Sequence, residues 1–302
     1  MGALEQTDSS KNVVQTEPVD EAPIPEKPPR SRVKHGWKAF WLLVVIIAIV
    51  LGLAASKEMR TSRFQAREAS KFAKTLSYEL KPGPTDSIRY PGAGPFDLRL
   101  GYSSLGEFLP RLLKRDYVIS AQTRFSPALM DYTGKGLFVP YAEKIQAGLS
   151  ITDCRANPLY QYKYPQQLYS SFEAIPPVVV NSLLFIENRF LLDPRQPLAN
   201  PAVDWPRFGM AAYTQVAKML HLPGQSAGGS TLATQLEKYR HSPDGLTVSG
   251  GEKIRQMVSA TVRAYQDGPQ TLKARQNVVR DYLNSVPLSA VPGHGEVHGM
   301  AE

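Results

Sequence analysis

The sequence predicts a mainly α-helical protein in which one transmembrane helix and a small β-containing pre-domain precede a larger helical domain. Three observations support this fold class. An uncharged apolar run near the N-terminus is long enough to cross a bilayer, and a Pro- and Gly-rich stretch follows it. From residue 172 onward, apolar residues recur at helical spacing in successive segments.

The chain has 302 residues, a formal net charge of +8 and one cysteine, Cys154. This length suits one or two domains of about 100–200 residues each. A single cysteine cannot form an internal disulfide, and we expect it to be an unreactive thiol. The basic balance suits nucleic acid, an anionic membrane or a phosphorylated substrate. Because zinc-finger spacing, RNP-like strands and basic aromatic helices are missing from the sequence, we expect no nucleic-acid partner.

Residues 1–36 are acidic and Pro-rich, so we expect a disordered cytoplasmic tail. Residues 37–56 are predicted to form the transmembrane helix, because the uncharged run from Ala39 to Ser56 spans about 27 Å as a helix, close to the roughly 30 Å of the hydrocarbon core. Trp37 and Trp41 suit the membrane interface. A long leader precedes the run, which favours an uncleaved anchor over a secretory signal. Lys and Arg flank both sides, so charge alone does not set the orientation.

Residues 57–95 are predicted to form a stalk and a linker, with a helix over 57–80 and Pro and Gly concentrated over 82–95. The pre-domain over 96–171 is expected to hold a short helix at 105–117. Alternating residues predict strands at 136–144, 148–154 and 159–164.

Helices are predicted over residues 176–190, 208–220, 230–240, 252–268 and 271–284. Prolines suit the first turn of the first of these helices, and Ser230 or Gly229 is the expected cap of the third. Near the C-terminus, His294 and His298 would suit zinc on a helix. The Pro and Gly residues around them favour a loop, so we expect no firm metal site.

Three stretches of this helical part could carry chemistry. Glu187 ends an apolar helix, where it is either a solvated cap or a general base. In GGSTLATQLEK, Gln235 and Lys238 share one helix face, although an ordinary capped helix has the same pattern. In EKIRQ, Lys253 and Gln256 share a face and Arg255 lies beside it.

An ATPase was a further alternative, because GLTVSGGEKIRQ at residues 245–256 is similar to the signature loop of ATP-binding cassettes. Such a protein also needs a phosphate-binding loop with a lysine. The nearest match, GQSAGGST at residues 224–231, has Ser230 where that lysine should be. We therefore do not expect an ATPase.

In this order, these stretches resemble the family 51 glycosyltransferases, the peptidoglycan transglycosylases of penicillin-binding proteins and their monofunctional relatives. AIPPVVVNSLLFIENRF resembles the EDRxF motif and its helix, GGSTLATQLEKY the GGST(I/L)TQQLxKN motif, EKIRQ the RKxxE motif, and YLN at 282–284 the fourth motif. The resemblance covers about residues 172–300. The sequence departs from the family pattern at Asn188, Phe190, Ala233, Thr234, Glu252 and Gln256.

The resemblance implies a lysozyme-like transglycosylase domain over residues 172–302. It implies polymerisation of lipid II by an inverting displacement of undecaprenyl pyrophosphate, as part of cell wall biogenesis, with Glu187 as the base. No cofactor is required, and a divalent metal can assist at the pyrophosphate. The implied substrate-binding residues are Arg189, Ser230, Thr231, Gln235, Lys238, Lys253, Arg255 and Gln256.

The resemblance also implies a single-pass protein of the bacterial cytoplasmic membrane, with the catalytic domain on the periplasmic or extracellular side. Lipid II, the growing glycan strand and other cell-wall synthesis proteins are the implied partners. The apolar helix over 208–223 lies at the position of the segment that enters the membrane in members of this family. The alternative interpretation is an ordinary core helix.

The main alternative is a catalytically degenerate domain that binds lipid II or cell-wall enzymes as a scaffold. Asn188 and Gln256 favour it, since Gln256 replaces a carboxylate and holds no charge. The chain also stops at Glu302, soon after the fourth motif, so we expect a domain that is incomplete at its C-terminus. Glu252, one turn before Gln256, is a candidate substitute carboxylate.

Overall fold

The computed structural model describes residues 33–92, 94–220, 229–293 and 295–302, and the chain divides into two compact units, Met1–Leu51 and Gly52–Glu302. The described part of the first unit belongs to helix α1 (Val33–Thr61). Its stretch Gly36–Thr61 is long and apolar enough to cross a membrane. The predicted apolar helix is therefore confirmed and extends beyond residue 56, whereas most of the predicted tail lies outside the described residues.

The second unit begins with helix α2 (Arg63–Thr75), which follows α1 after a left-handed residue, Ser62 (φ 49°). The carboxylate of Glu58 accepts hydrogen bonds from the backbone N–H groups of Phe64 and Gln65, both at 2.9 Å, and so caps the start of α2. Strand β1 (Tyr78–Pro82) then pairs with β2 (Ala121–Phe125) in antiparallel fashion. The predicted helical stalk is thus correct only as far as Thr75, because the next residues enter a sheet.

The predicted pre-domain contains more elements than the sequence indicated. Helix α3 (Pro95–Arg99) leads through a 3-10 turn (Tyr102–Ser104) to α4 (Leu105–Leu113), which confirms the short helix predicted there. Helix α5 (Pro127–Gly134) follows β2. The strand predicted over residues 136–144 is wrong, because this segment is a loop tied to helix α9 (Gly250–Ala264). In that loop, Phe138 donates its N–H to the Ser259 hydroxyl at 2.9 Å.

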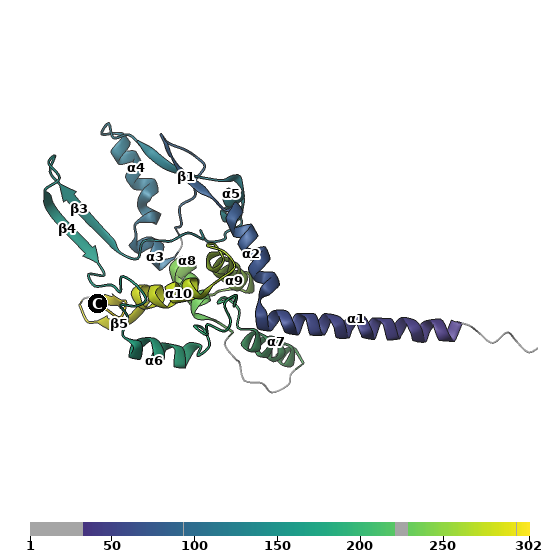
Figure 1. Ribbon diagram of the computed structural model, residues 1–302. Helices are drawn as coiled ribbons and strands as arrows, with labels where there is room; N and C mark the ends of the chain where they lie inside the picture. The colour runs from purple at the N-terminus through teal and green to yellow at the C-terminus, as the bar shows by residue number, and fades with distance from the viewer. Residues whose placement is uncertain (1–32, 93, 221–228, 294) are drawn as a thin grey trace, which may run out of the picture. The chain divides into compact units, whose positions relative to one another are not determined.

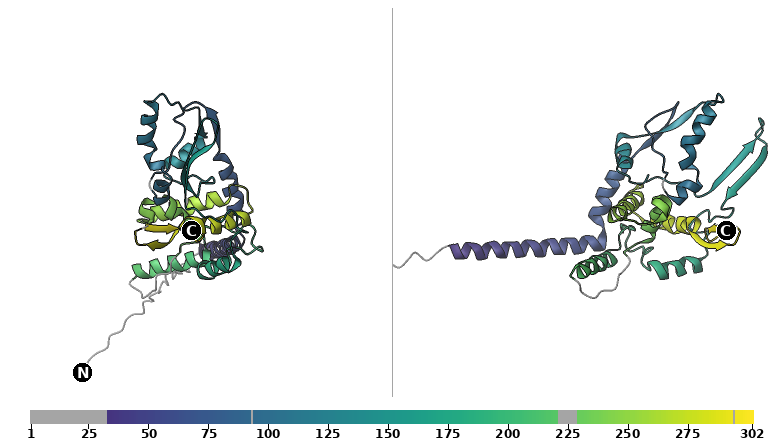
Figure 2. Two further views of the ribbon diagram at one scale, coloured as in Figure 1. Left: turned by 90° about the vertical axis from the view of Figure 1, so that its left-hand side faces the viewer. Right: turned by 180° about the vertical axis from the view of Figure 1, so that it is seen from behind.

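Strands β3 (Ala147–Thr152) and β4 (Pro158–Tyr164) confirm the other two predicted strands and form a hairpin that projects from the second unit (Figures 1 and 2). Leu149 lies opposite Tyr162, and Ile151 opposite Tyr160. These exposed apolar residues therefore share one face of the hairpin.

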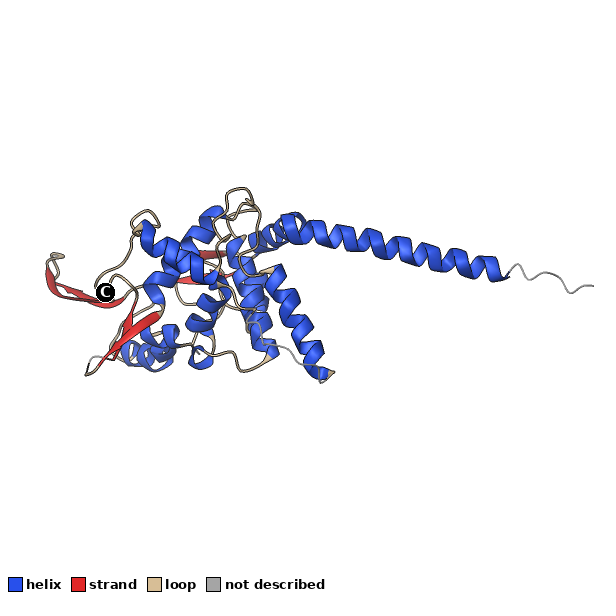
Figure 3. Cartoon of the chain, turned by 90° about the horizontal axis from the view of Figure 1, so that it is seen from below, coloured by secondary structure: helices blue, strands red, loops and turns tan. Residues whose placement is uncertain are grey.

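The remaining helices agree with the sequence prediction. They are α6 (Pro177–Glu187), α7 (Trp205–Met219), α8 (Leu232–His241), α9 and α10 (Leu272–Ser285), with a 3-10 turn (Pro243–Gly245) after α8. A hairpin of β5 (Pro287–Val291) and β6 (Gly295–His298) follows. It corrects the loop predicted around His298, whereas His294 lies outside the described residues. Figure 3 shows that the strands occur in pairs and that helices make up most of the second unit.

Two larger apolar clusters and a small one of alanines lie among the described residues of the second unit, where α8, α9 and α10 pack against one another (Figure 1). The first cluster joins α6, α8 and α10 through Ile175, Val180, Leu184, Leu191, Leu232, Val279 and Leu283. The second joins α2, β2 and α5 to Val262 of α9. The segments on either side of the predicted boundary at residue 171 therefore share a core, and that boundary itself stays a prediction.

Candidate active site

Glu187 is the last residue of α6, and its half-buried side chain faces α8. Pro176 and Pro177 start this helix, since proline suits a first turn. The helix ends at Asn188, which is extended and whose side-chain oxygen accepts the N–H of Phe190 at 3.0 Å. Asp forms this type of turn as readily as Asn does. The replacement of Asp by Asn188 therefore preserves the turn that presents Glu187.

Gln235 connects Glu187 to the rest of the helical domain. Its Nε2 donates a hydrogen bond to Oε2 of Glu187 at 2.9 Å, and its Oε1 lies 3.5 Å from the hydroxyl of Tyr282 on α10. Burial and the nearby Glu187 carboxylate raise the pKa of Tyr282, so the phenol stays protonated and can donate. Side chains from α6, α8 and α10 thus hold the Glu187 carboxylate in one orientation.

Two lysines form a positively charged site at the same helix. Nζ of Lys253 donates to Oγ of Ser230 at 2.6 Å, just before the start of α8. Partial burial lowers the pKa of Lys253, and the neighbouring charge of Lys238 lowers it further. Among the described residues neither ammonium group has a carboxylate partner. Lys253 lies beside the N-terminus of α8 and Lys238 in its last turn, and two neighbouring cations are suited to bind an anion.

Three of the predicted substrate-binding residues have other contacts. Thr231, not Ser230 or Gly229, is the N-cap of α8, and its buried hydroxyl accepts the N–H of Thr234 at 3.3 Å. The guanidinium of Arg189 lies 4.0 Å from the centre of the Phe185 ring, on the exposed side of α6. Arg255 forms an ion pair with Glu252 at 2.8 Å. The structure therefore brings together Glu187 with Gln235, and Ser230 with Lys253, which has Lys238 as a neighbouring charge.

Gln256 is 1% exposed and lies in a buried polar network. Its Nε2 donates to Oγ of Ser242 at 2.9 Å and to Oγ1 of Thr247 at 3.0 Å, while Ser242 donates to Glu252 at 2.5 Å. A glutamate at this position could not make the first two donations when ionised. Glu252 is also buried and held by Ser242 and Arg255, so it does not replace a carboxylate at the surface of the site.

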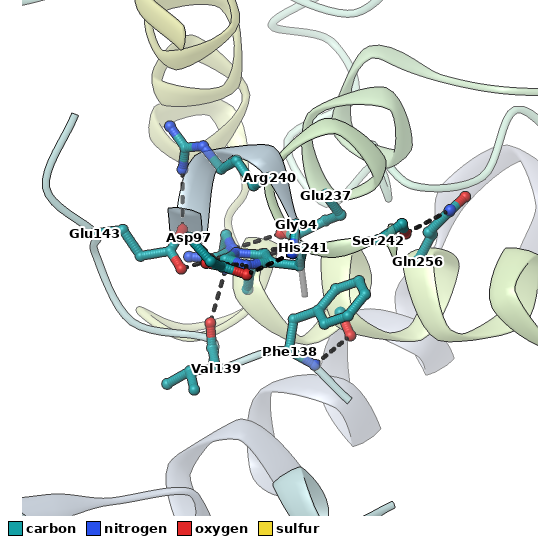
Figure 4. A network of polar contacts seen from close by, with 12 residues as sticks. Gly94, Asp97, Phe138, Val139, Glu143, Glu237, Arg240, His241, Ser242 and Gln256 are labelled. Atoms are coloured by element: carbon teal, nitrogen blue, oxygen red, sulfur yellow. Dashed lines mark hydrogen bonds and ion pairs between the residues drawn. The ribbon is translucent and has the colours of Figure 1, made fainter. Parts of the chain in front are cut away.

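A second buried network lies at the C-terminal end of α8, and the sequence analysis did not predict it. Figure 4 shows His241 between Asp97 of α3 and Glu143, with Nδ1 at 3.0 Å from Asp97 and Nε2 at 2.8 Å from Glu143. Arg240 lies 3.2 Å from Glu143. Arg263 contacts Glu237 at 2.5 Å. These charges connect the segment before β3 to α8 and α9.

The charges of this network support one another. Burial alone would lower the pKa of His241, but Glu143 and Asp97 raise it to about 9, so His241 is a buried cation at neutral pH. Burial alone would raise the pKa of Glu143, but His241, Arg263 and Arg240 hold it well below its ordinary value. The sequence offers one indication of this network, namely the adjacent basic residues Arg240 and His241 in the last turn of α8, where the helix dipole stabilises cations.

Comparison of the sequence with known protein families identifies the domain that contains this site. Residues 155–302 match the family model described as Transglycosylase. This part of the chain is a family 51 transglycosylase domain. No curated protein and no solved structure matches the chain.

The match to the transglycosylase family begins upstream of the resemblance seen in the motifs and includes strand β4. Membership implies polymerisation of peptidoglycan glycan strands from lipid II. The described residues of the transglycosylase domain and the segment before it hold no cluster of three or more His, Cys, Asp or Glu side chains that could bind a metal ion. Cys154 is free and exposed.

Proposed function

We propose that the chain is a peptidoglycan glycosyltransferase in which Glu187 removes the proton from the acceptor hydroxyl of the glycan. The hydroxyl oxygen then attacks the anomeric carbon of the donor sugar, and the bond to the lipid pyrophosphate breaks. The observation that carries the proposal is the hydrogen bond from Gln235 to Glu187 at 2.9 Å. It holds one carboxylate oxygen and leaves the other for the acceptor, as a general base requires.

The second part of the proposal assigns the leaving pyrophosphate to Lys238, Lys253 and Ser230. Negative charge grows on the leaving group as the glycosidic bond breaks, and fixed cations stabilise it there. Lys253 is held by Ser230 at 2.6 Å and has Lys238 as its neighbour. A divalent metal ion would share this role with the lysines, and the proposed reaction needs no other cofactor. Arg189, Arg255 and Gln256 have no part in this proposal because of the contacts described above.

Two apolar surfaces support the membrane placement of the proposed enzyme. Helix α1 carries the candidate membrane span Gly36–Thr61. Helix α7 exposes Phe208, Met210, Tyr213 and Met219, whereas Ala217 on the same helix is buried. An apolar helix surface of this kind suits the interface of a bilayer. We propose a single-pass protein whose catalytic domain lies on the outer side of the cytoplasmic membrane, where lipid II presents its sugars.

The test is polymerisation of labelled lipid II by the full chain in detergent. We expect glycan strands from the wild-type protein and a rate at least about 100-fold lower for Glu187→Gln, since general acid–base catalysis contributes about 10²–10⁴-fold. Glu173→Gln is the matched control, because Glu173 is an exposed carboxylate in the segment before α6. Strands made equally fast by Glu187→Gln would refute the assignment of the base.

A scaffold that binds lipid II without polymerising it remains the second candidate. The observation that favours it is Gln256, which occupies the position of the third-motif glutamate and is buried in a structural network. The same assay separates the two functions. Retained lipid II binding without any glycan strands from the wild-type chain would support the scaffold and refute the enzyme.

A further inference from the structure

The β3–β4 hairpin carries a half-exposed apolar face. Leu149 lies opposite Tyr162 and Ile151 opposite Tyr160, so these four side chains point to the same side of the hairpin. Each of them is 44–54% exposed. The hairpin projects from the helices of the second unit, and its apolar face is therefore open to another molecule (Figures 1 and 2).

The residue pattern of the hairpin is typical of a sheet with one buried face. Ser150, Gln161 and Lys163 point to the side opposite the apolar face, so apolar and polar positions alternate over most of both strands. A two-stranded hairpin is marginally stable in water unless something packs against it. Its outer edges also present unpaired backbone groups, which favour association with another chain. These features favour a partner that offers an apolar surface.

The two ends of the hairpin carry opposite charges. In the turn, the side chain of Arg155 is exposed and forms no ion pair with the described residues. At the base, the hydroxyl of Tyr164 donates to the backbone oxygen of Glu296 at 2.8 Å, so β6 lies beside the end of β4. The side chain of Glu296 is 64% exposed and lies 3.6 Å from His298, which is neutral at pH 7 because burial lowers its pKa. A cation at the turn and a carboxylate at the base are thus both available to a partner.

We propose that the apolar face of the β3–β4 hairpin binds the same face of a second copy of this chain, with the two hairpins antiparallel. A two-fold axis through the face then places the turn of each hairpin at the base of the other. Arg155 of each copy meets Glu296 of the other copy, which gives two identical ion pairs. In a parallel arrangement like charges would meet at both ends, which costs free energy. The inference goes beyond the proposed function and does not depend on it.

The area of the apolar face fits a weak dimer. Since an aromatic side chain buries about 150–250 Å² in full, four half-exposed side chains per copy remove roughly 800 Å² in total from water. Interfaces below about 1,200 Å² are weak or transient. The proposed membrane anchor α1 offsets this weakness, because copies held in one bilayer meet at a high effective concentration. We therefore expect dimers in membranes and monomers in dilute detergent.

The arrangement of the dimer is tested with Cys154, the single cysteine of the chain, which is exposed in the turn of the hairpin. The full chain is reconstituted in proteoliposomes, oxidised with copper phenanthroline and separated on non-reducing gels. In Glu296→Cys the new thiol lies near Cys154 of the second copy, so we expect a covalent dimer. Within one copy the two thiols lie at opposite ends of a strand of about 20 Å, which is too far for a disulfide. A wild-type dimer crosslinked through Cys154 alone would show parallel hairpins and overturn the inference.

The strength of association is measured by energy transfer between copies labelled at the N-terminal amine, while the lipid-to-protein ratio of the proteoliposomes is varied. Tyr160→Glu places a charge in the middle of the apolar face, and we expect about tenfold weaker association, which is about 1.4 kcal/mol. Leu159→Glu is the matched control, because Leu159 is 68% exposed and points to the opposite face of the same strand. It should associate like the wild type.

The ion pairs are tested by charge reversal in the same assay. Arg155→Glu and Glu296→Arg each bring like charges together and should weaken association, whereas the double variant restores both pairs and should associate nearly like the wild type. Because misfolding of a single variant would not be repaired by the second substitution, this recovery is specific to the contact between copies.

Four results would overturn the inference. They are a wild-type chain that stays monomeric at every lipid ratio, association that Tyr160→Glu leaves unchanged, and a double charge reversal that does not recover. The fourth is labelling of the Tyr160 peptide by a photoreactive phospholipid in the wild type, which would assign the apolar face to the bilayer instead of a second copy.

Discussion

Replacing Arg263 by leucine should destabilise the second unit strongly without altering the residues proposed to act in catalysis. The guanidinium donates to the backbone oxygens of Tyr141 at 2.6 Å and Val139 at 2.7 Å, and it pairs with Glu237, which is 2% exposed. Leucine removes both backbone bonds, each worth about 1.5–3 kcal/mol when the donor is charged. It also leaves the Glu237 carboxylate buried without its closest cation. Breaking a buried pair in this way costs about 3–5 kcal/mol.

The assay is thermal unfolding of the full chain followed by circular dichroism. For a unit of this size the loss corresponds to a fall in the unfolding midpoint of about 6–20 °C. Arg195→Leu is the control, because Arg195 is 82% exposed and pairs with Asp193 at the surface, so its midpoint should not move. An Arg263→Leu protein that unfolds at the wild-type temperature would refute the view that this network joins the loop before β3 to α8 and α9.

Three further predictions follow from the same contacts. Folding raises the pKa of His241 from 6.5 to about 9, so its protonation adds up to about 3 kcal/mol to the free energy of unfolding. This stabilisation is complete below pH 6.5 and is lost as the pH rises through 9. The unfolding midpoint should therefore fall across this pH range, and His241→Gln should make the fall smaller. Gln256→Glu should lower the unfolding midpoint, since it buries a second carboxylate next to Ser242 and Glu252. In the lipid II assay it should not raise the polymerisation rate. A faster enzyme would contradict the structural role of Gln256. Lys253→Met should reduce kcat/KM for lipid II by at least about tenfold, because it removes a charged contact to the pyrophosphate worth about 1.5–3 kcal/mol. An unchanged kcat/KM would show that Lys253 does not bind the pyrophosphate.

Local patterns in the sequence were sufficient for much of the fold. The apolar run that became α1 and the periodic segments that became α6 to α10 were predicted because helix formation and amphipathic spacing depend on residues close together in the chain. The same locality placed Gln235 and Lys238 on one face of α8. It failed for residues 136–144, whose alternating pattern suggested a strand, because hydrogen bonds from Arg263 and to Ser259 fix this segment as a loop.

Within the candidate site, the sequence by itself determined which residue types are present and in which order along the chain. Tertiary structure decided which of them meet. Lys253 reaches Ser230 across 23 residues, and Gln235 reaches Glu187 across 48. It also decided that Gln256 is a buried structural residue, because its partners lie on the segment that leads from α8 into α9.

The buried charge network shows this division most clearly. Each charged residue of α8 reads as an ordinary solvated side chain in the sequence, since helix propensity and charge pattern are the same for a buried and an exposed position. His241 is a cation at neutral pH because Asp97, which lies 144 residues earlier, and Glu143 are brought against it in the buried interior. A pKa depends on distance and burial in space, and only the folded chain sets those two quantities.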